Sequence, residues 1–191
     1  MSAERNENSG PRDRSAKPKS NPRAQTAHPE AIEQMIQARR LESVAVNPGH
    51  AREVLRMASQ HLQTARVLAE TADQAMAFTA CYDAARKALT AVLAAHGLRA
   101  RSAGGSHQAT GRAAAGFIQD SSLGEFEWMR QVRNATEYPA EDRPAATEDD
   151  VAEGIDAAER IIRACELHLA SVIDLDDSGA GEGGPEDAPK R

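Results

Sequence analysis

Apolar residues recur at helical spacing through the middle of the chain. Asn47 followed by Pro48 is a typical helix start, and the apolar residues behind it are separated by steps of three and four. They are Ala51, Leu55, Ala58, Leu62, Ala65 and Leu68. A second run extends from about Ala75 to His96 and contains Phe78, Cys81, Tyr82, Ala85, Leu89 and Val92. The pattern predicts two long amphipathic helices, the second ended by Gly97.

The clearest periodic run lies near the C-terminus. Thr147, with Asp150 three residues later, is typical of a helix start. The apolar residues that follow alternate steps of four and three: Val151, Ile155, Ala158, Ile162, Cys165, Leu169 and Val172. This is the seam of a helical bundle or a coiled coil. The seam is interpreted as intramolecular core, and the alternative is the interface of a structural helical dimer.

Three shorter helices complete the predicted fold. One follows Pro29 and runs through Leu41, and one runs from about Ser106 to Ile118 after the Gly104-Gly105 loop. Ser122 and Glu125 fit a capping box that opens a third, which ends near Tyr138. No segment has the pattern of a β-strand. The sequence therefore predicts an all-α fold: an up-and-down helical bundle of about five to six helices.

Both ends of the chain are polar. Residues 1–27 are rich in Pro, Ser, Asn and basic side chains, and residues 174–191 are acidic and rich in Gly and Pro. Such segments bury too little apolar surface to offset their ordering entropy. We expect disordered N- and C-terminal tails on either side of a bundle over residues 28–173. The favoured interpretation is that the tails serve solubility and spacing. The alternative is that the basic arm contacts nucleic acid or that the two oppositely charged tails attract each other.

Composition narrows the function classes. Aromatic residues make up 3% of the chain, the net charge is -6 and the pI is about 5.5. These values argue against a general nucleic-acid-coating protein but leave room for a local basic site. Cys81 and Cys165 have no metal-ligand spacing, so we expect two reduced, packed thiols. Without an apolar membrane span or signal-peptide core, we expect a cytoplasmic protein with no membrane partner.

The segment from Trp128 to Pro139 places charge on an apolar helix face. Arg133 follows Met129 by four residues, and Glu137 follows Arg133 by four. A charge there is costly unless it is paired or faces a polar cleft. Either Arg133 and Glu137 form an ion pair that fixes the helix end, or the pair lines a groove in which Arg133 binds phosphate.

The order of these motifs resembles bacterial HEPN (higher eukaryotes and prokaryotes nucleotide-binding) domains. The motifs are two long helices, Tyr82-Asp-Ala-Ala-Arg-Lys-Ala88, the Gly-Gly-Ser-His loop, Arg133-Asn-Ala-Thr-Glu-Tyr138 and a long final helix. The resemblance covers about Ala31 to Ile173. It implies an up-and-down helical bundle that usually dimerises. Many members are ribonucleases or toxins of toxin–antitoxin, defence and stress systems, and others are non-catalytic partners or nucleotide-binding modules.

The family's ribonuclease motif predicts the site residues. The motif is an arginine, a polar neighbour, and a histidine that four to six residues separate from the arginine, with two copies meeting at the dimer interface. Arg133 and Asn134 match, but Tyr138, Pro139 and Ala140 stand where the histidine belongs. Tyrosine, with a reference pKa of about 10, is a weaker general base than histidine near neutral pH. The predicted catalytic residues are therefore Arg133, Asn134, Glu137 and Tyr138, the last two as substitutes.

Other polar residues are weaker candidates. His107 acts in a site or caps the helix that it opens, and the cap is the favoured interpretation. Asp83, Arg86 and Lys87 are interpreted as a solvated face with Tyr82 packed at its edge. The other histidines of the predicted bundle match no zinc-ligand pattern. No phosphate-binding glycine loop is present. We therefore expect no metal and no cofactor.

Two functional hypotheses follow. In the first, the chain is a HEPN-type module of a toxin–antitoxin, defence or stress system that binds or acts on RNA or nucleotide as a homodimer. In the second, it is a non-enzymatic protein-interaction module that partners a separate enzyme or antitoxin, such as a nucleotidyltransferase. Arg133 and Asn134 favour the first, whereas the acidic composition and the missing histidine favour the second. The pattern does not decide between the roles of toxin and antitoxin.

Overall fold

The computed structural model describes residues 29–101, 105–138 and 145–179. The predicted tail over residues 1–27 and the end of the chain from residue 180 lie outside the described residues. The described elements are α1 (Pro29–Gln37), β1 (Leu41–Ser43), α2 (Pro48–Ala69), α3 (Gln74–Ala95), β2 (Leu98–Ala100), α4 (Ser106–Ala114), the 3-10 turn η1 (Ser121–Gly124), α5 (Glu125–Glu137) and α6 (Glu148–Gly179). The six α-helices confirm the predicted all-α class.

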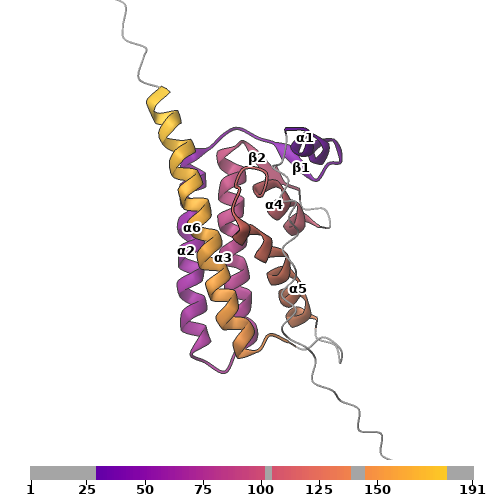
Figure 1. Cartoon of the computed structure of the whole chain (residues 1–191), viewed down its shortest axis with the longest axis vertical. Coiled ribbons are helices and arrows are strands. Elements are labelled where there is room, and N and C mark those ends of the chain that lie inside the picture. Colours follow the sequence, from indigo (N-terminus) through magenta and orange to yellow (C-terminus); the bar gives the residue numbers. More distant parts are fainter. Residues whose placement is uncertain (1–28, 102–104, 139–144, 180–191) are drawn as a thin grey trace, which may run out of the picture.

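The helices form an up-and-down bundle around α3. Helix α2 runs in one direction, α3 returns beside it, α4 and α5 together lead back, and α6 runs alongside α3 (Figure 1). Helix α3 packs against α2, α4, α5 and α6. The predicted stripe of α3 is fully buried, from Phe78 to Val92. Burial on every side explains why α3 carries so many alanines: small side chains let four helices approach it closely.

Side-chain caps start the long helices where the sequence predicts. The Asn47 carboxamide accepts a hydrogen bond from the His50 backbone N–H at 2.9 Å. Thr147 and Asp150 form a reciprocal capping box: each side chain accepts from the other residue's backbone N–H, at 3.2 and 2.8 Å. The box expected at Ser122 is wrong. Asp120 caps there instead, accepting the Ser122 backbone N–H at 2.9 Å, and η1 precedes α5.

Two short strands correct the expectation of no β-structure. β1 and β2 pair antiparallel, with Leu41 opposite Ala100 and Ser43 opposite Leu98. Gly97 makes the turn into β2 with a φ of +64°, and its carbonyl accepts the Val44 backbone N–H at 2.9 Å. A Cβ at Gly97 would lie 2.8 Å from the Val44 carbonyl oxygen, so glycine is required there. The pair ties the chain before α2 to the chain after α3.

Helix α6 lies in the core along most of its predicted seam. Val151, Ala158, Cys165 and Leu169 are buried, although Ile155 is only half-buried. Packing against α3 and α2 therefore uses the seam inside one chain, as the intramolecular interpretation expects. The helical backbone continues to Gly179, six residues beyond the boundary predicted at Ile173.

The two cysteines have unreactive, protonated thiols. Cys81 on α3 and Cys165 on α6 are both free and buried. Burial raises the pKa of each thiol to about 12. Both thiols therefore stay protonated near neutral pH and act as small apolar core residues. None of the described helices combines the length and the apolar content that crossing a bilayer demands.

Candidate functional site

The Tyr82 ring marks the place where α3, α4 and α5 meet. Tyr82 is 1% exposed. Its ring stacks on Phe126 of α5, with centroids 5.2 Å apart and planes 11° apart. The His107 ring of α4 lies 5.7 Å from it. Two aromatic contacts from separate helices therefore fix the phenol in one position.

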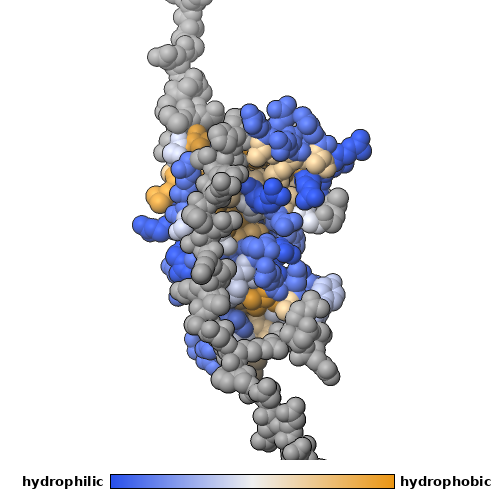
Figure 2. Space-filling view, turned by 45° about the vertical axis from the view of Figure 1, so that its right-hand side comes forward, coloured by the Kyte–Doolittle hydropathy of each residue, from blue (hydrophilic) through white to orange (hydrophobic). Residues whose placement is uncertain are grey.

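Three arginines lie around this ring. The Arg133 guanidinium carbon lies 6.0 Å from the Tyr82 ring centroid. Arg86 follows Tyr82 by four residues on α3, and Arg130 precedes Arg133 by three on α5. We call Tyr82, Arg86, His107, Arg130 and Arg133 the Tyr82 cluster. On the face that Figure 2 shows, the described surface is mostly hydrophilic and apolar residues form only small, separate areas.

Charge and burial act in opposite directions on the Tyr82 phenol. Burial raises the pKa of Tyr82 to about 12, against the opposing positive charges of Arg86, Arg133 and Arg130. The phenol is therefore a neutral donor at physiological pH. Its hydroxyl oxygen is buried and has no hydrogen-bond partner among the described residues. Buried polar atoms are usually satisfied, so this hydroxyl is an unmet hydrogen-bonding group at the centre of the cluster.

Each cluster arginine has a carboxylate partner on its own helix. Arg133 pairs with Glu137, Arg86 with Asp83 at 2.9 Å, and Arg130 with Glu127 at 2.6 Å. The arginine side chains are 25% to 29% exposed, whereas the carboxylate side chains are 36% to 47% exposed. In every pair the carboxylate side chain is therefore more exposed to solvent than the arginine side chain. Such partly exposed pairs contribute about 0–1 kcal/mol each, so an incoming phosphate can replace a carboxylate at small cost.

His107 belongs to the cluster and does not cap α4. The N-cap position is Gly105, with a φ of +90°, and no side chain caps this helix. The favoured cap role of His107 is therefore wrong. Burial lowers the pKa of the His107 imidazole, and the positive charges of Arg86 and Arg133 lower it further. The ring is neutral at pH 7 and can accept a proton.

The predicted site residues are only partly brought together. Arg133 and Glu137 form the expected ion pair, and Arg133 faces the buried phenol. Asn134 is exposed, and Tyr138 is 71% exposed at the end of α5, where its backbone N–H bonds the Asn134 carbonyl at 3.0 Å. Within the described parts of the chain, neither side chain forms a hydrogen bond, ion pair or ring contact with the Tyr82 cluster. Pro139 and Ala140 lie outside the described residues.

The sequence does not identify the whole cluster. Arg86 is predicted on a solvated face, and its side chain instead pairs with Asp83 at one end of a groove. Its spacing of four residues from Tyr82 is a local signal, because it places both residues on neighbouring turns of α3. The sequence offers His107 as a site residue but favours the cap, because the approach of its ring to Tyr82 depends on how α4 packs against α3.

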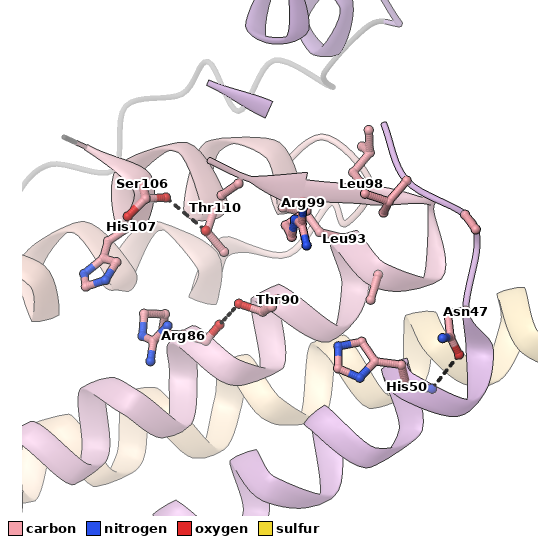
Figure 3. A pocket seen from close by; sticks show the side chains of 14 residues that line it. Asn47, His50, Arg86, Thr90, Leu93, Leu98, Arg99, Ser106, His107 and Thr110 are labelled. Atoms are coloured by element: carbon pink, nitrogen blue, oxygen red, sulfur yellow. Dashed lines mark hydrogen bonds between the residues drawn. The ribbon is translucent and has the colours of Figure 1, made fainter. Parts of the chain in front are cut away.

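A groove leads away from the cluster. Its volume is about 560 Å³, and α3, α4 and the chain around β1 and β2 form its walls. Figure 3 shows Arg86 and His107 near one end, with Asn47 and His50 toward the other. The Thr90 hydroxyl donates to the Arg86 carbonyl at 2.8 Å, and the Thr110 hydroxyl donates to the Ser106 carbonyl at 3.0 Å. None of the described residues that line the groove is acidic.

No metal centre is visible in the described ranges. Groups of three or more His, Cys, Asp or Glu side chains with ligand geometry are absent there. His96 and His168 approach each other, with their Nε2 atoms 2.8 Å apart, but they lack a third ligand among the described residues. The three guanidinium groups and the neutral imidazole of the Tyr82 cluster are suited to bind an anion.

Comparison with known families identifies the domain. A family model for the HEPN domain matches residues 51–168, more than half of the chain. The matched range includes most of α2, all of α3, α4 and α5, and much of α6, so it contains the whole Tyr82 cluster. Among curated proteins and solved structures, none matches.

Proposed function

Because the chain belongs to the HEPN family, we propose that it binds RNA through the Tyr82 cluster, as a component of a toxin–antitoxin, defence or stress system. One observation carries this proposal. Three guanidinium groups and a neutral imidazole converge on one buried tyrosine in a chain with a net charge of -6. Each guanidinium is paired with a more exposed carboxylate, so a phosphate that replaces these carboxylates would meet three guanidinium groups at one place of an acidic protein.

The chemistry of the cluster suits an RNA backbone. Arginine donates two parallel hydrogen bonds to a phosphate, and the three cluster arginines come from two helices at different angles. Phosphate would replace the outer carboxylates, since the arginines lie on the inner side of each pair. We propose that the protein acts as a homodimer, as HEPN domains commonly do.

RNA cleavage is a separate question from binding. Another residue stands in place of the motif histidine. Of the two predicted substitutes, Tyr138 is exposed, whereas Glu137 pairs with Arg133. Glu137 is therefore the predicted substitute that lies beside Arg133. The proposal is therefore RNA binding, with Arg133 as its central contact.

A second candidate rests on the outer carboxylates. Each carboxylate is more exposed to solvent than its arginine partner, and together they place negative charge around the cluster. These carboxylates are Asp83, Glu127 and Glu137. A basic surface on a separate protein could pair with these carboxylates. In this alternative the chain is a protein-interaction module for an antitoxin or an enzyme such as a nucleotidyltransferase.

Binding of a fluorescently labelled single-stranded RNA, followed by anisotropy, separates the two candidates. Arg133→Gln and Arg86→Gln are expected to weaken binding about tenfold each, the effect of losing one charged contact. Arg56→Gln is the matched control, because Arg56 forms the same kind of pair with Glu53 on α2, away from Tyr82. Equal RNA affinities for the cluster variants and the control would overturn the proposal. Size-exclusion chromatography with light scattering tests the dimer.

A further inference from the structure

Two histidines meet outside the Tyr82 cluster, where the end of α3 approaches α6. His96 is the C-cap residue of α3, and His168 follows the buried Cys165 by three residues on α6. The Nε2 atoms of the two rings are 2.8 Å apart, and the ring centroids are 5.2 Å apart. Both residues are only partly buried, so an ion need not cross the core to reach them.

The His96 ring is held in place from two sides. It stacks on the Phe117 ring, with centroids 3.8 Å apart and planes 8° apart, and the His168 ring lies 6.5 Å from the same Phe117 ring. The backbone N–H of His96 donates to the carbonyls of Val92 and Leu93 at 3.2 and 3.1 Å. Side chains that are already held in this way lose little freedom when they bind a common partner.

The contact between the two rings joins chemically identical nitrogen atoms. One Nε2 carries a proton and donates, and the other must be neutral to accept. A metal cation between the rings would take the place of the shared proton, and each nitrogen would direct its lone pair to the cation. Neutral imidazole is the commonest protein ligand of transition metals, and it suits Zn²⁺, Ni²⁺ and Cu²⁺.

The spacing of the rings fits two ligands of one tetrahedral ion. With Zn–N bonds of about 2.0–2.1 Å, two nitrogen ligands of a tetrahedral zinc ion lie about 3.3 Å apart. The two Nε2 atoms, at 2.8 Å, are therefore closer than this by only about half an ångström. A small shift of the His168 ring opens that gap, and the His96 ring keeps its stack on Phe117.

We propose that His96 and His168 bind one Zn²⁺ ion through their Nε2 atoms and thereby link the end of α3 to α6. Water completes the coordination, because the described ranges hold no group of three or more ligating side chains. Mg²⁺ and Ca²⁺ do not compete, since both prefer oxygen ligands. The site is independent of the proposed RNA binding, because neither histidine belongs to the Tyr82 cluster or lines the groove.

Titration of the EDTA-treated, full-length protein with zinc chloride tests the proposal. Calorimetry gives the affinity and the stoichiometry, and nitrogen-15 NMR of the histidine rings shows which nitrogen atoms bind. His168→Gln removes one ligand but keeps a side chain that can hydrogen-bond to His96. His50→Gln is the matched control, because His50 is exposed and lies in the first turn of α2. Thermal unfolding checks that each variant folds.

The wild type is expected to bind one equivalent of Zn²⁺ and to show shifted Nε2 resonances for His96 and His168, whereas Mg²⁺ shifts neither. His168→Gln should weaken zinc binding about tenfold or more, and His50→Gln should bind as the wild type does. Equal zinc affinities for the two variants would overturn the proposal. So would a wild-type titration that leaves the Nε2 resonances of the pair unshifted, and this readout decides the question even if His168→Gln does not fold.

Discussion

The guanidinium carbon of Arg133, on α5, lies 6.0 Å from the centroid of the Tyr82 ring on α3. The two residues are far apart in the sequence. Phe126, two turns before Arg133 on the same face of α5, stacks on the Tyr82 ring. The Arg133 side chain therefore lies between the Tyr82 ring and its partner Glu137.

Replacing Tyr82 by phenylalanine should separate stability from binding. An unsatisfied buried hydroxyl costs about 1–3 kcal/mol, so Tyr82→Phe is expected to raise the free energy of unfolding by about 1 kcal/mol. The hydroxyl oxygen has almost no exposed surface, so the same change should leave RNA affinity within about twofold of the wild type. Urea denaturation and RNA anisotropy measure the two effects. Tyr138→Phe, at an exposed position, should change neither; a Tyr82→Phe protein less stable than wild type would contradict this account.

Gly97 should be intolerant of any side chain. Gly97→Ala forces a non-glycine residue into φ +64° and places its Cβ 2.8 Å from the Val44 carbonyl oxygen, at an expected cost of about 1–3 kcal/mol. Gly124→Ala is the control, because Gly124 has a φ of -65° and open space around it. That control should be neutral or stabilise by up to about 1 kcal/mol. Equal unfolding midpoints for the two variants would show that the β1–β2 connection tolerates strain.

Stability should fall on acidification through the His96–His168 pair. The Nε2 atoms lie 2.8 Å apart, so one imidazole must donate and the other accept, and both cannot be protonated without losing this bond. Burial lowers the pKa of both rings, and the charge of His168 also lowers the pKa of His96. As the pH falls, the two histidines are therefore protonated near pH 6.5 in the unfolded chain and only at a lower pH in the folded protein. The free energy of unfolding is highest above pH 6.5 and decreases as the pH falls from there through the lowered folded-state pKa values.

Urea unfolding at pH 7.5, 6.5 and 5.5 measures this dependence. His168→Gln removes one titrating ring of the pair and should make stability less dependent on pH. His50→Gln, at an exposed position, should leave the dependence as in the wild type. A wild-type protein with the same stability at all three pH values would contradict the predicted role of the pair.

The long helices could be predicted from the sequence, because their apolar residues recur at helical spacing. Asn47, Asp150 and the stripe of α3 place three long helices correctly, because capping and amphipathic spacing are properties of neighbouring residues. The strands were missed because each has only three residues, too few for an alternating pattern, and they pair across the whole α2–α3 hairpin. The capping box predicted at Ser122 does not form, because the Asp120 carboxylate accepts the Ser122 backbone N–H that the Glu125 side chain would accept in the box.

The site was less predictable than the fold. Arg133 and Glu137 lie on one helix, so their pairing follows from a spacing of four residues. Arg86 and His107 reach the same place from other helices, and no local pattern encodes that meeting. Asn134 and Tyr138 were expected beside Arg133 from the family motif, but both side chains are exposed, since helical geometry turns consecutive residues to different faces.

The salt dependence of RNA binding tests the central claim most directly. For single-stranded RNA, the slope of the logarithm of the binding constant against the logarithm of salt concentration changes by about 0.7 for each phosphate contact. We predict that a variant with Arg86, Arg130 and Arg133 all replaced by glutamine has a slope about 2 units shallower than wild type. We predict no change for Arg56→Gln. A triple variant with the wild-type slope would contradict phosphate binding by the Tyr82 cluster.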